Sequence, residues 1–284
     1  MEIDYEDLKP LGKTGEKVPA IGMGTWGIGG RFTPDYSKDA LWVDALRFGI
    51  KYSIEKVGMA LIDTAEMYGA GHSEEIVGRA MKEFPRDKVF VVTKVKGEHL
   101  RYEDVIKAAK GSLSRLGIKQ IDLYLIHWPN PIIPLKETMK AMEKLVNNGL
   151  VRFIGVSNFG RRLLEEARSY LSFTDIVVNQ VRYSIAYREP EADLLPYCQR
   201  EGILLMAYTP LEKGALARNP ILEEVGRKYN KTAAQVALNW LIAKKNVITI
   251  PKSERKERIK ENLDAMGWRL SKEDIEYLNE RFSA

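Results

Sequence analysis

Cysteine is almost absent from this chain of 284 residues, because Cys198 is the only one. A single cysteine excludes an intramolecular disulfide and any metal site built from several cysteines. The chain has only 3 histidines, His72, His99 and His127, and they form no H-x-x-x-H pattern. No carboxylate cluster accompanies them, so we expect no bound metal and disfavour a metal-dependent or phosphate-handling enzyme.

Long apolar runs are also missing. No apolar stretch approaches the ~18 residues that a transmembrane helix needs, so no membrane span is expected. The opening residues, MEIDYEDLKPL, are acidic and lack an apolar centre, which argues against a signal peptide. We therefore expect a cytoplasmic protein.

The charges form no block of one sign. The chain has 44 Lys and Arg against 39 Asp and Glu, a formal net charge of +5. This balance makes nucleic acid a poor candidate partner, whereas it suits a small ligand that carries phosphate. We expect a small-molecule substrate and a monomer or a small homo-oligomer.

Eight short apolar runs read as strands, several of them rich in Val and Ile throughout, as strands buried on both faces are. They lie at residues 20–24, 60–63, 89–95, 122–128, 153–157, 176–180, 203–208 and 247–250. Segments with helical period separate them, among them 101–116, 134–148, 232–243 with Thr232 as its cap, and a last helix opened by Ser271.

Eight alternations favour a single-domain (β/α)₈ TIM barrel over residues 1–284, a fold that typically takes about 250 residues. The spacing alone leaves an open α/β sheet as an alternative. Residues 8–20, with glycines and prolines, predict an N-terminal β-hairpin that covers the bottom of the barrel.

The segment GMGTWG at 22–27 matches the dinucleotide fingerprint G-x-G-x-x-G. A true fingerprint opens a helix directly, but here Trp26 lies inside the motif and a loop-like GIGGRFTPD follows. We interpret these glycines as loop formers, not as a Rossmann motif.

Four side chains that can move or polarise a proton lie at or just past the ends of adjacent predicted strands: Asp63, Tyr68, Lys94 and His127. In an α/β barrel the carboxyl ends of the strands meet at the catalytic rim. We expect Lys94 to lower the pKa of Tyr68 toward the working pH, Asp63 to keep Lys94 charged, and His127 to orient a substrate oxygen. Asp63, Tyr68 or His127 taken singly would more often be structural; together they indicate function.

These residues belong to motifs that resemble those of the aldo-keto reductases. The resemblance covers nearly the whole chain through GMGTW (22–26), IDTAEMYG (62–69), TK (93–94), DLYLIHWP (122–129), IGVSNF (154–159), NQ (179–180), AYTPL (207–211) and IPKSERKERIKENL (250–263). It implies a TIM barrel that reduces aldehydes or ketones with NADPH, with Tyr68 as the proton donor.

The resemblance also implies cofactor contacts. It assigns the nicotinamide carboxamide to Ser157, Asn158 and Gln180, ring stacking to Tyr208, and the pyrophosphate to Thr209, Pro210, Leu211, Lys213 and Gly214. Lys252, Ser253 and Arg258 would bind the 2′-phosphate of NADPH, and Glu261 and Asn262 the adenine. An ammonium, a hydroxyl and a guanidinium suit a phosphate dianion, although the same residues would also suit a solvated first turn of a helix.

Trp26 and Trp128 are expected to wall the substrate pocket beside Tyr68 and His127, with barrel-top packing as the alternative for either tryptophan. Residues 51–63 are longer than the family usually has before the second strand, which extends the first helix or adds a loop. The segments after His127 and after Asn262 are short for the family, which predicts an open pocket and broad carbonyl acceptance. A cofactor-binding regulatory protein, like the potassium-channel β subunits that share the fold, is the alternative, and the intact quartet argues against it.

Overall fold

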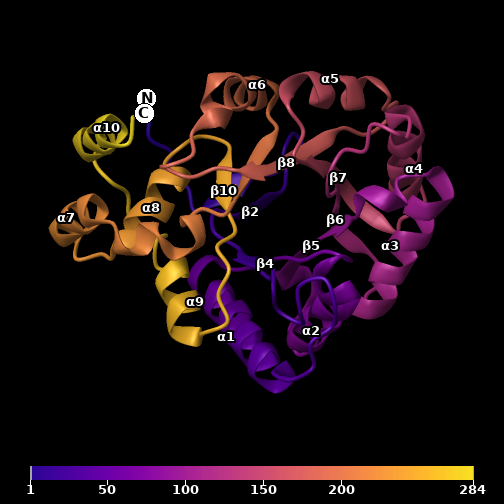
Figure 1. The fold of residues 1–284 in the computed structure, drawn as a ribbon, viewed down its shortest axis with the longest axis horizontal. Helices are drawn as coiled ribbons and strands as arrows, with labels where there is room; N and C mark the ends of the chain where they lie inside the picture. The colour runs from indigo at the N-terminus through magenta and orange to yellow at the C-terminus, as the bar shows by residue number, and fades with distance from the viewer. Residues whose placement is uncertain (1, 284) are drawn as a thin grey trace.

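In the computed structural model, which describes residues 2–283, eight parallel strands form one sheet that a ring of helices surrounds (Figure 1). The order of the strands in the sheet follows their order in the chain. They are β3 (Met23–Gly24), β4 (Ala60–Asp63), β5 (Val89–Val95), β6 (Ile121–Ile126), β7 (Val151–Ser157), β8 (Ile176–Arg182), β9 (Leu204–Tyr208) and β10 (Val247–Thr249). All eight predicted strands are therefore present.

The first and last strands of the sheet meet and close the barrel. Parallel bridges join Ile21 to Thr249 and Gly24 to Lys252, and the Gly22 N–H donates to Thr249 O at 2.9 Å. A Cβ on Gly24 would lie 2.7 Å from Ile250 O, and one on Gly22 would lie 2.5 Å from the side chain of Leu61. These glycines thus permit the close approach of strands, and no helix follows them until residue 39, so the Rossmann interpretation is excluded.

Helices cover the outside of the sheet. They are α1 (Asp39–Val57), α2 (His72–Met81), α3 (Tyr102–Leu116), α4 (Leu135–Asn147), α5 (Arg161–Ser169), α6 (Leu194–Glu201), α7 (Pro220–Tyr229), α8 (Ala233–Ile242), α9 (Lys256–Leu263) and α10 (Lys272–Arg281). The long segment before β4 is accounted for by the 19 residues of α1, so it extends the helix. No helix in residues 2–283 has the length and apolar character that a membrane span requires.

Local sequence signals fix where several helices begin and end. The Thr232 hydroxyl accepts from the Gln235 N–H at 3.2 Å, and the Gln235 side chain accepts from the Thr232 N–H at 3.0 Å. This reciprocal capping box starts α8 at the predicted residue. At the other end of a helix, Gly117 takes a φ of 68° after α3, a conformation that favours glycine.

Apolar side chains fill the barrel interior, and a short antiparallel hairpin covers one end. Its strands are β1 (Leu8–Pro10) and β2 (Lys17–Pro19). Leu11 and Val18 belong to the same buried cluster as Leu61, Phe90 and Leu204, which lie in or near the amino-terminal halves of barrel strands. The hairpin therefore covers the bottom of the barrel, as predicted, and leaves the opposite rim uncovered by it.

Candidate active site

The four predicted proton-handling residues converge at the carboxyl rim of the barrel. Asp63 ends β4, Tyr68 begins the turn after it, Lys94 lies near the end of β5, and His127 directly follows β6. The Lys94 Nζ lies 2.6 Å from Asp63 Oδ1 and 3.2 Å from the Tyr68 hydroxyl. The rings of Tyr68 and His127 meet edge to face at 5.7 Å.

The ammonium of Lys94 uses all three of its protons. Besides Asp63 and Tyr68, its Nζ donates to the backbone O of Thr64 at 2.9 Å, and the side chain is fully buried. Since the Tyr68 oxygen accepts one of these bonds, the phenolic proton is left to point elsewhere. The arrangement can therefore present a neutral O–H donor to a ligand while a cation supports the oxygen from behind.

Asp63 and Lys94 form a buried ion pair. Burial alone would lower the pKa of Lys94, but the Asp63 carboxylate and the Tyr68 oxygen raise it, and the net direction is upward. The Gln180 Nε2 donates to the second carboxylate oxygen of Asp63 at 2.8 Å, so both oxygens are satisfied. Because each charge has partners, the lysine stays protonated inside the barrel.

The pKa of Tyr68 is raised, so the expected net lowering is wrong. Burial of the phenol is the largest cause, the charge of Lys94 opposes it, and the charge of Asp63 adds to it. Tyr68 is only 8% exposed. At a site so shielded from water, the loss of hydration destabilises the phenolate by more than the neighbouring Lys94 ammonium stabilises it. Tyr68 is consequently held in its protonated form.

His127 is neutral. Burial, with a further contribution from the charge of Lys94, lowers its pKa to about 3. Its Nδ1 is buried and has no hydrogen-bond partner among the described residues. A neutral imidazole has a single N–H to donate, so it can orient an oxygen beside Tyr68 without bringing a second cation into the site.

Aromatic rings surround the opening of the site. Trp26 packs 5.1 Å from Tyr68 and Trp128 stacks at 6.4 Å on His127, so the two tryptophans lie beside the site, and their role as walls of a substrate pocket stays a prediction. They are 37% and 50% exposed. Phe32, which was not predicted, packs edge to face on Trp26 at 5.4 Å and adds a third ring. Both tryptophans could contact a ligand that extends outward from Tyr68.

The residues predicted to hold the nicotinamide lie together at or near the carboxyl ends of β7, β8 and β9. The Tyr208 hydroxyl donates to Asn158 Oδ1 at 2.6 Å, Asn158 Nδ2 donates to His127 O at 3.1 Å, and the Ser157 hydroxyl donates to Gln180 O at 2.9 Å. Asn158 has a φ of 63°. The Asn158 Oδ1 has a second lone pair, so it can accept from a carboxamide N–H while the bond from Tyr208 is kept.

The loop after β9 contains the residues assigned to the pyrophosphate. Pro210 is buried, Leu211 is half-buried, and Lys213 and Gly214 are exposed. Thr209 and Lys213 have φ values of 53° and 56°, an unusual left-handed conformation for residues with side chains, and such strain concentrates at functional loops. The loop is anchored by Glu212, a residue that was not predicted. Its Oε1 accepts from the Ser184 hydroxyl at 2.7 Å, and its Oε2 pairs with Arg182.

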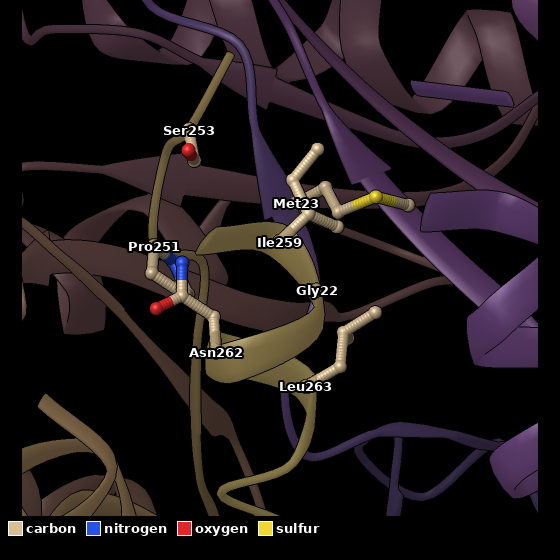
Figure 2. A pocket seen from close by; sticks show the side chains of 7 residues that line it. All are labelled: Gly22, Met23, Pro251, Ser253, Ile259, Asn262 and Leu263. Carbon is tan, nitrogen blue, oxygen red and sulfur yellow. The ribbon is translucent and has the colours of Figure 1, made fainter. Parts of the chain in front are cut away.

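The residues assigned to the adenosine end lie just before α9 and along it. Ser253, on the loop before α9, and Asn262, on the helix, line a narrow pocket together with Gly22 and Pro251 (Figure 2). Its volume is about 10 Å³. Two assigned cations are paired with neighbouring carboxylates at the surface. The Arg258 guanidinium lies 2.6 Å from Glu261, and Lys252 lies 2.9 Å from Glu254.

The buried carboxylate of Glu66, which was not predicted, connects the loop after β4 to the end of β5 and the loop that follows it. The Glu66 N–H donates to Lys94 O at 3.3 Å, and Glu66 Oε1 accepts from the Lys96 N–H at 2.8 Å and contacts His99 Nδ1 at 3.0 Å. Glu66 lies inside the motif IDTAEMYG, two residues before Tyr68, so its place in the motif was the available signal.

Residues 20–281 match the family model described as the aldo/keto reductase family. The chain is 36% identical over 272 residues to the methylglyoxal reductase YeaE of Escherichia coli (strain K12), which covers 94% of this chain and 92% of that protein. It also resembles a crystal structure of the thermostable aldo-keto reductase Tm1743 in complex with the inhibitor epalrestat. That match has 48% identity, a TM-score of 0.90 and coverage of 96% of this chain and 98% of the other.

A second solved structure adds a bound cofactor. It is an aldo/keto reductase from Klebsiella pneumoniae in complex with NADP and acetate, 36% identical to this chain with a TM-score of 0.87. The match covers 98% of this chain and 95% of the Klebsiella chain. These similarities extend over the strand ends and loops described above, and therefore over the whole candidate site.

Proposed function

The chain belongs to the aldo/keto reductase family, and we propose that it reduces aldehydes and activated ketones to alcohols with NADPH, with Tyr68 as the general acid. The observation that carries the proposal is the triple donation by Lys94, which supports the Tyr68 oxygen and leaves the phenolic proton free. A buried, neutral phenol with a cation behind it is suited to protonate an oxygen on which negative charge develops.

The donor set fits NADPH. Lys252, Ser253 and Arg258 provide an ammonium, a hydroxyl and a guanidinium for a phosphate, and the amides of Asn158 and Gln180 match a carboxamide. Tyr208, half-buried at the end of β9, can stack on one face of a planar ring. When bound, the reduced nicotinamide supplies a hydride to the carbonyl carbon. The NADP complex of the Klebsiella relative supports this choice of cofactor.

The side chains of the site orient the carbonyl oxygen and supply its proton. His127, neutral at working pH, donates a hydrogen bond that orients the carbonyl oxygen toward Tyr68. Tyr68 transfers its proton to that oxygen as charge develops, and Lys94 stabilises the phenolate that remains. Asp63 keeps Lys94 charged and in place through the 2.6 Å ion pair.

We propose broad carbonyl acceptance, including dicarbonyls such as methylglyoxal and aromatic aldehydes. The support is the exposed rim formed by Trp26 and Trp128, which contacts a substrate through apolar surface and offers no charged side chain of its own. The E. coli relative is named for methylglyoxal reduction, which makes that compound the first substrate to assay.

The test compares the wild type with Tyr68→Phe in steady-state NADPH oxidation with methylglyoxal and with 4-nitrobenzaldehyde. We expect kcat to fall about 10²- to 10⁴-fold in the variant, the usual contribution of a positioned acid, while NADPH still quenches the tryptophan fluorescence. Tyr5→Phe, at a tyrosine that is 71% exposed, is the matched control and should retain full activity. NADPH binding without turnover by the wild type would instead indicate a cofactor-binding regulatory protein.

A further inference from the structure

The segment 26–37 lies over the turn that carries Tyr68. The Gly69 N–H donates to Arg31 O at 2.7 Å, and a Cβ on Gly29 would lie 2.7 Å from the backbone N of Ser73. This segment contributes Trp26 and Phe32, two of the three rings around the opening. Its position therefore sets how the outer part of a substrate is contacted.

A buried histidine stands where this segment meets two helices. His72, the first residue of α2, is 5% exposed. Its Nε2 lies 2.8 Å from Asp39 Oδ1 at the start of α1, and its Nδ1 lies 2.6 Å from Glu75 Oε2 on α2. The ring also packs 4.3 Å from Tyr36, near the end of the segment.

The contacts of both ring nitrogens require two donors. A neutral imidazole has one N–H, so its other nitrogen would face a carboxylate with a lone pair, whereas the imidazolium donates to both. Burial lowers the pKa of His72, but the hydrogen bonds and charges of Glu75 and Asp39 raise it by more, and the net direction is upward.

Other charges face this group as well. Arg79 on α2 donates to the second oxygen of Asp39 at 3.0 Å. Asp35 of the segment is near enough that the charge of His72 contributes to lowering its pKa. Lys38 also faces Asp35, so three acids, Asp35, Asp39 and Glu75, lie near two cations, Lys38 and Arg79. This surplus of negative charge favours the doubly protonated imidazole.

We propose that His72 is a positioning residue for substrate selection, which through Asp39 and Tyr36 fixes the segment whose Trp26 and Phe32 contact the outer part of a bulky carbonyl substrate. The inference rests on the proposed reductase function. Phe32 is 70% exposed and lies beyond Trp26, so a small dicarbonyl held at Tyr68 gains little from it, whereas an aromatic aldehyde can extend toward it. Loss of the His72 contacts should raise the KM of the larger substrate and leave kcat nearly unchanged.

The pH profile of the wild type gives the first test. Protonated His72 donates hydrogen bonds to both Asp39 and Glu75, and one of these bonds is lost as the pH rises through the raised pKa of His72. Between about pH 6 and pH 9, the KM for 4-nitrobenzaldehyde should rise about five- to tenfold, the value of one aromatic contact, while the KM for methylglyoxal shows no such step. A KM ratio that does not change with pH would overturn the proposal.

Two variants isolate His72. His72→Gln, which cannot carry the charge, should have the high-pH KM for the aromatic aldehyde throughout and no step. Glu75→Gln changes a side chain that is 48% exposed, so the fold is retained, and it should move the midpoint of the step down by about one pH unit. An unmoved midpoint in Glu75→Gln, or a step that persists in His72→Gln, contradicts the assignment.

A control and an activity-independent readout complete the design. His99→Gln removes the other carboxylate-bonded histidine near the site and should keep the step. Amide hydrogen exchange over residues 26–37 should be faster in His72→Gln than in the wild type at about pH 6, even if neither carbonyl is a substrate. Unchanged exchange would reject the positioning role, whereas absence of turnover in the wild type would reject the reductase function alone.

Discussion

Replacing Lys94 by methionine tests whether the buried ammonium supports the acid. The two atoms concerned, Lys94 Nζ and the Tyr68 hydroxyl oxygen, are 3.2 Å apart. At an effective dielectric constant near 20, a unit charge at that distance stabilises a phenolate by about 5 kcal/mol, or roughly 4 pKa units. With the proton about half transferred in the transition state, Lys94→Met should lower kcat by about 10²-fold or more.

The substitution has a second effect that the design must separate. It leaves the Asp63 carboxylate buried with Gln180 as its remaining side-chain donor, and breaking a buried pair in this way destabilises a protein by about 3–5 kcal/mol. The double variant Lys94→Met with Asp63→Asn removes both charges and should recover much of the stability. Its kcat should remain as low as that of the single variant, because Tyr68 still lacks its cation.

The assay is NADPH oxidation with methylglyoxal and with 4-nitrobenzaldehyde, repeated with cofactor deuterated at the transferred position so that the chemical step is observed. Thermal melts and NADPH titrations show whether each variant is folded and binds cofactor. A Lys94→Met enzyme that is folded, binds NADPH and turns over at the wild-type rate would refute the role given to the ammonium. So would a double variant that regains activity along with stability.

Two further predictions address the cofactor and the histidine. Arg258→Ala should weaken NADPH binding about 10- to 100-fold and leave NADH binding nearly unchanged, because a guanidinium contact with the 2′-phosphate is lost; Arg255→Ala, a neighbouring exposed arginine, is the control, and equal losses for the two cofactors would contradict the assignment. The pKa of His127 is lowered to about 3 in the folded state, whereas an unfolded histidine takes up a proton below about pH 6.5. The free energy of unfolding should therefore decrease as the pH is lowered from about 6.5 to about 3, by up to about 1.4 kcal/mol per pH unit. Urea unfolding of the wild type and His127→Gln should show that part of the slope only in the wild type, and parallel slopes would disprove it.

Sequence patterns predicted the elements that carry the site because those patterns are local. The runs at 60–63 and 89–95 coincide with β4 and β5, and Thr232 begins α8 through a capping box whose residues are three apart. Placement of Asp63, Tyr68 and Lys94 at strand ends needed only these runs and the rule that parallel strands share an edge. Helix α7 was missed, although Asn219 caps it and Pro220 begins it, signals that the sequence does carry.

The sequence by itself therefore determined the alternation of strands and helices, the resemblance to the family and the side chains that lie at strand ends, since hydrophobic period, caps and motifs are properties of neighbouring residues. Closure of the sheet into a barrel depends on the bridges between its first and last strands, which are contacts between distant parts of the chain. The tertiary structure alone decided how those side chains behave. Burial of Tyr68 outweighs the charge of Lys94 and keeps the phenol protonated, contrary to the expectation from the sequence. The tertiary structure also places His72 between Asp39 and Glu75, because α1 and α2 pack side by side. Desolvation and long-range contacts depend on the whole fold, and no local pattern encodes their balance.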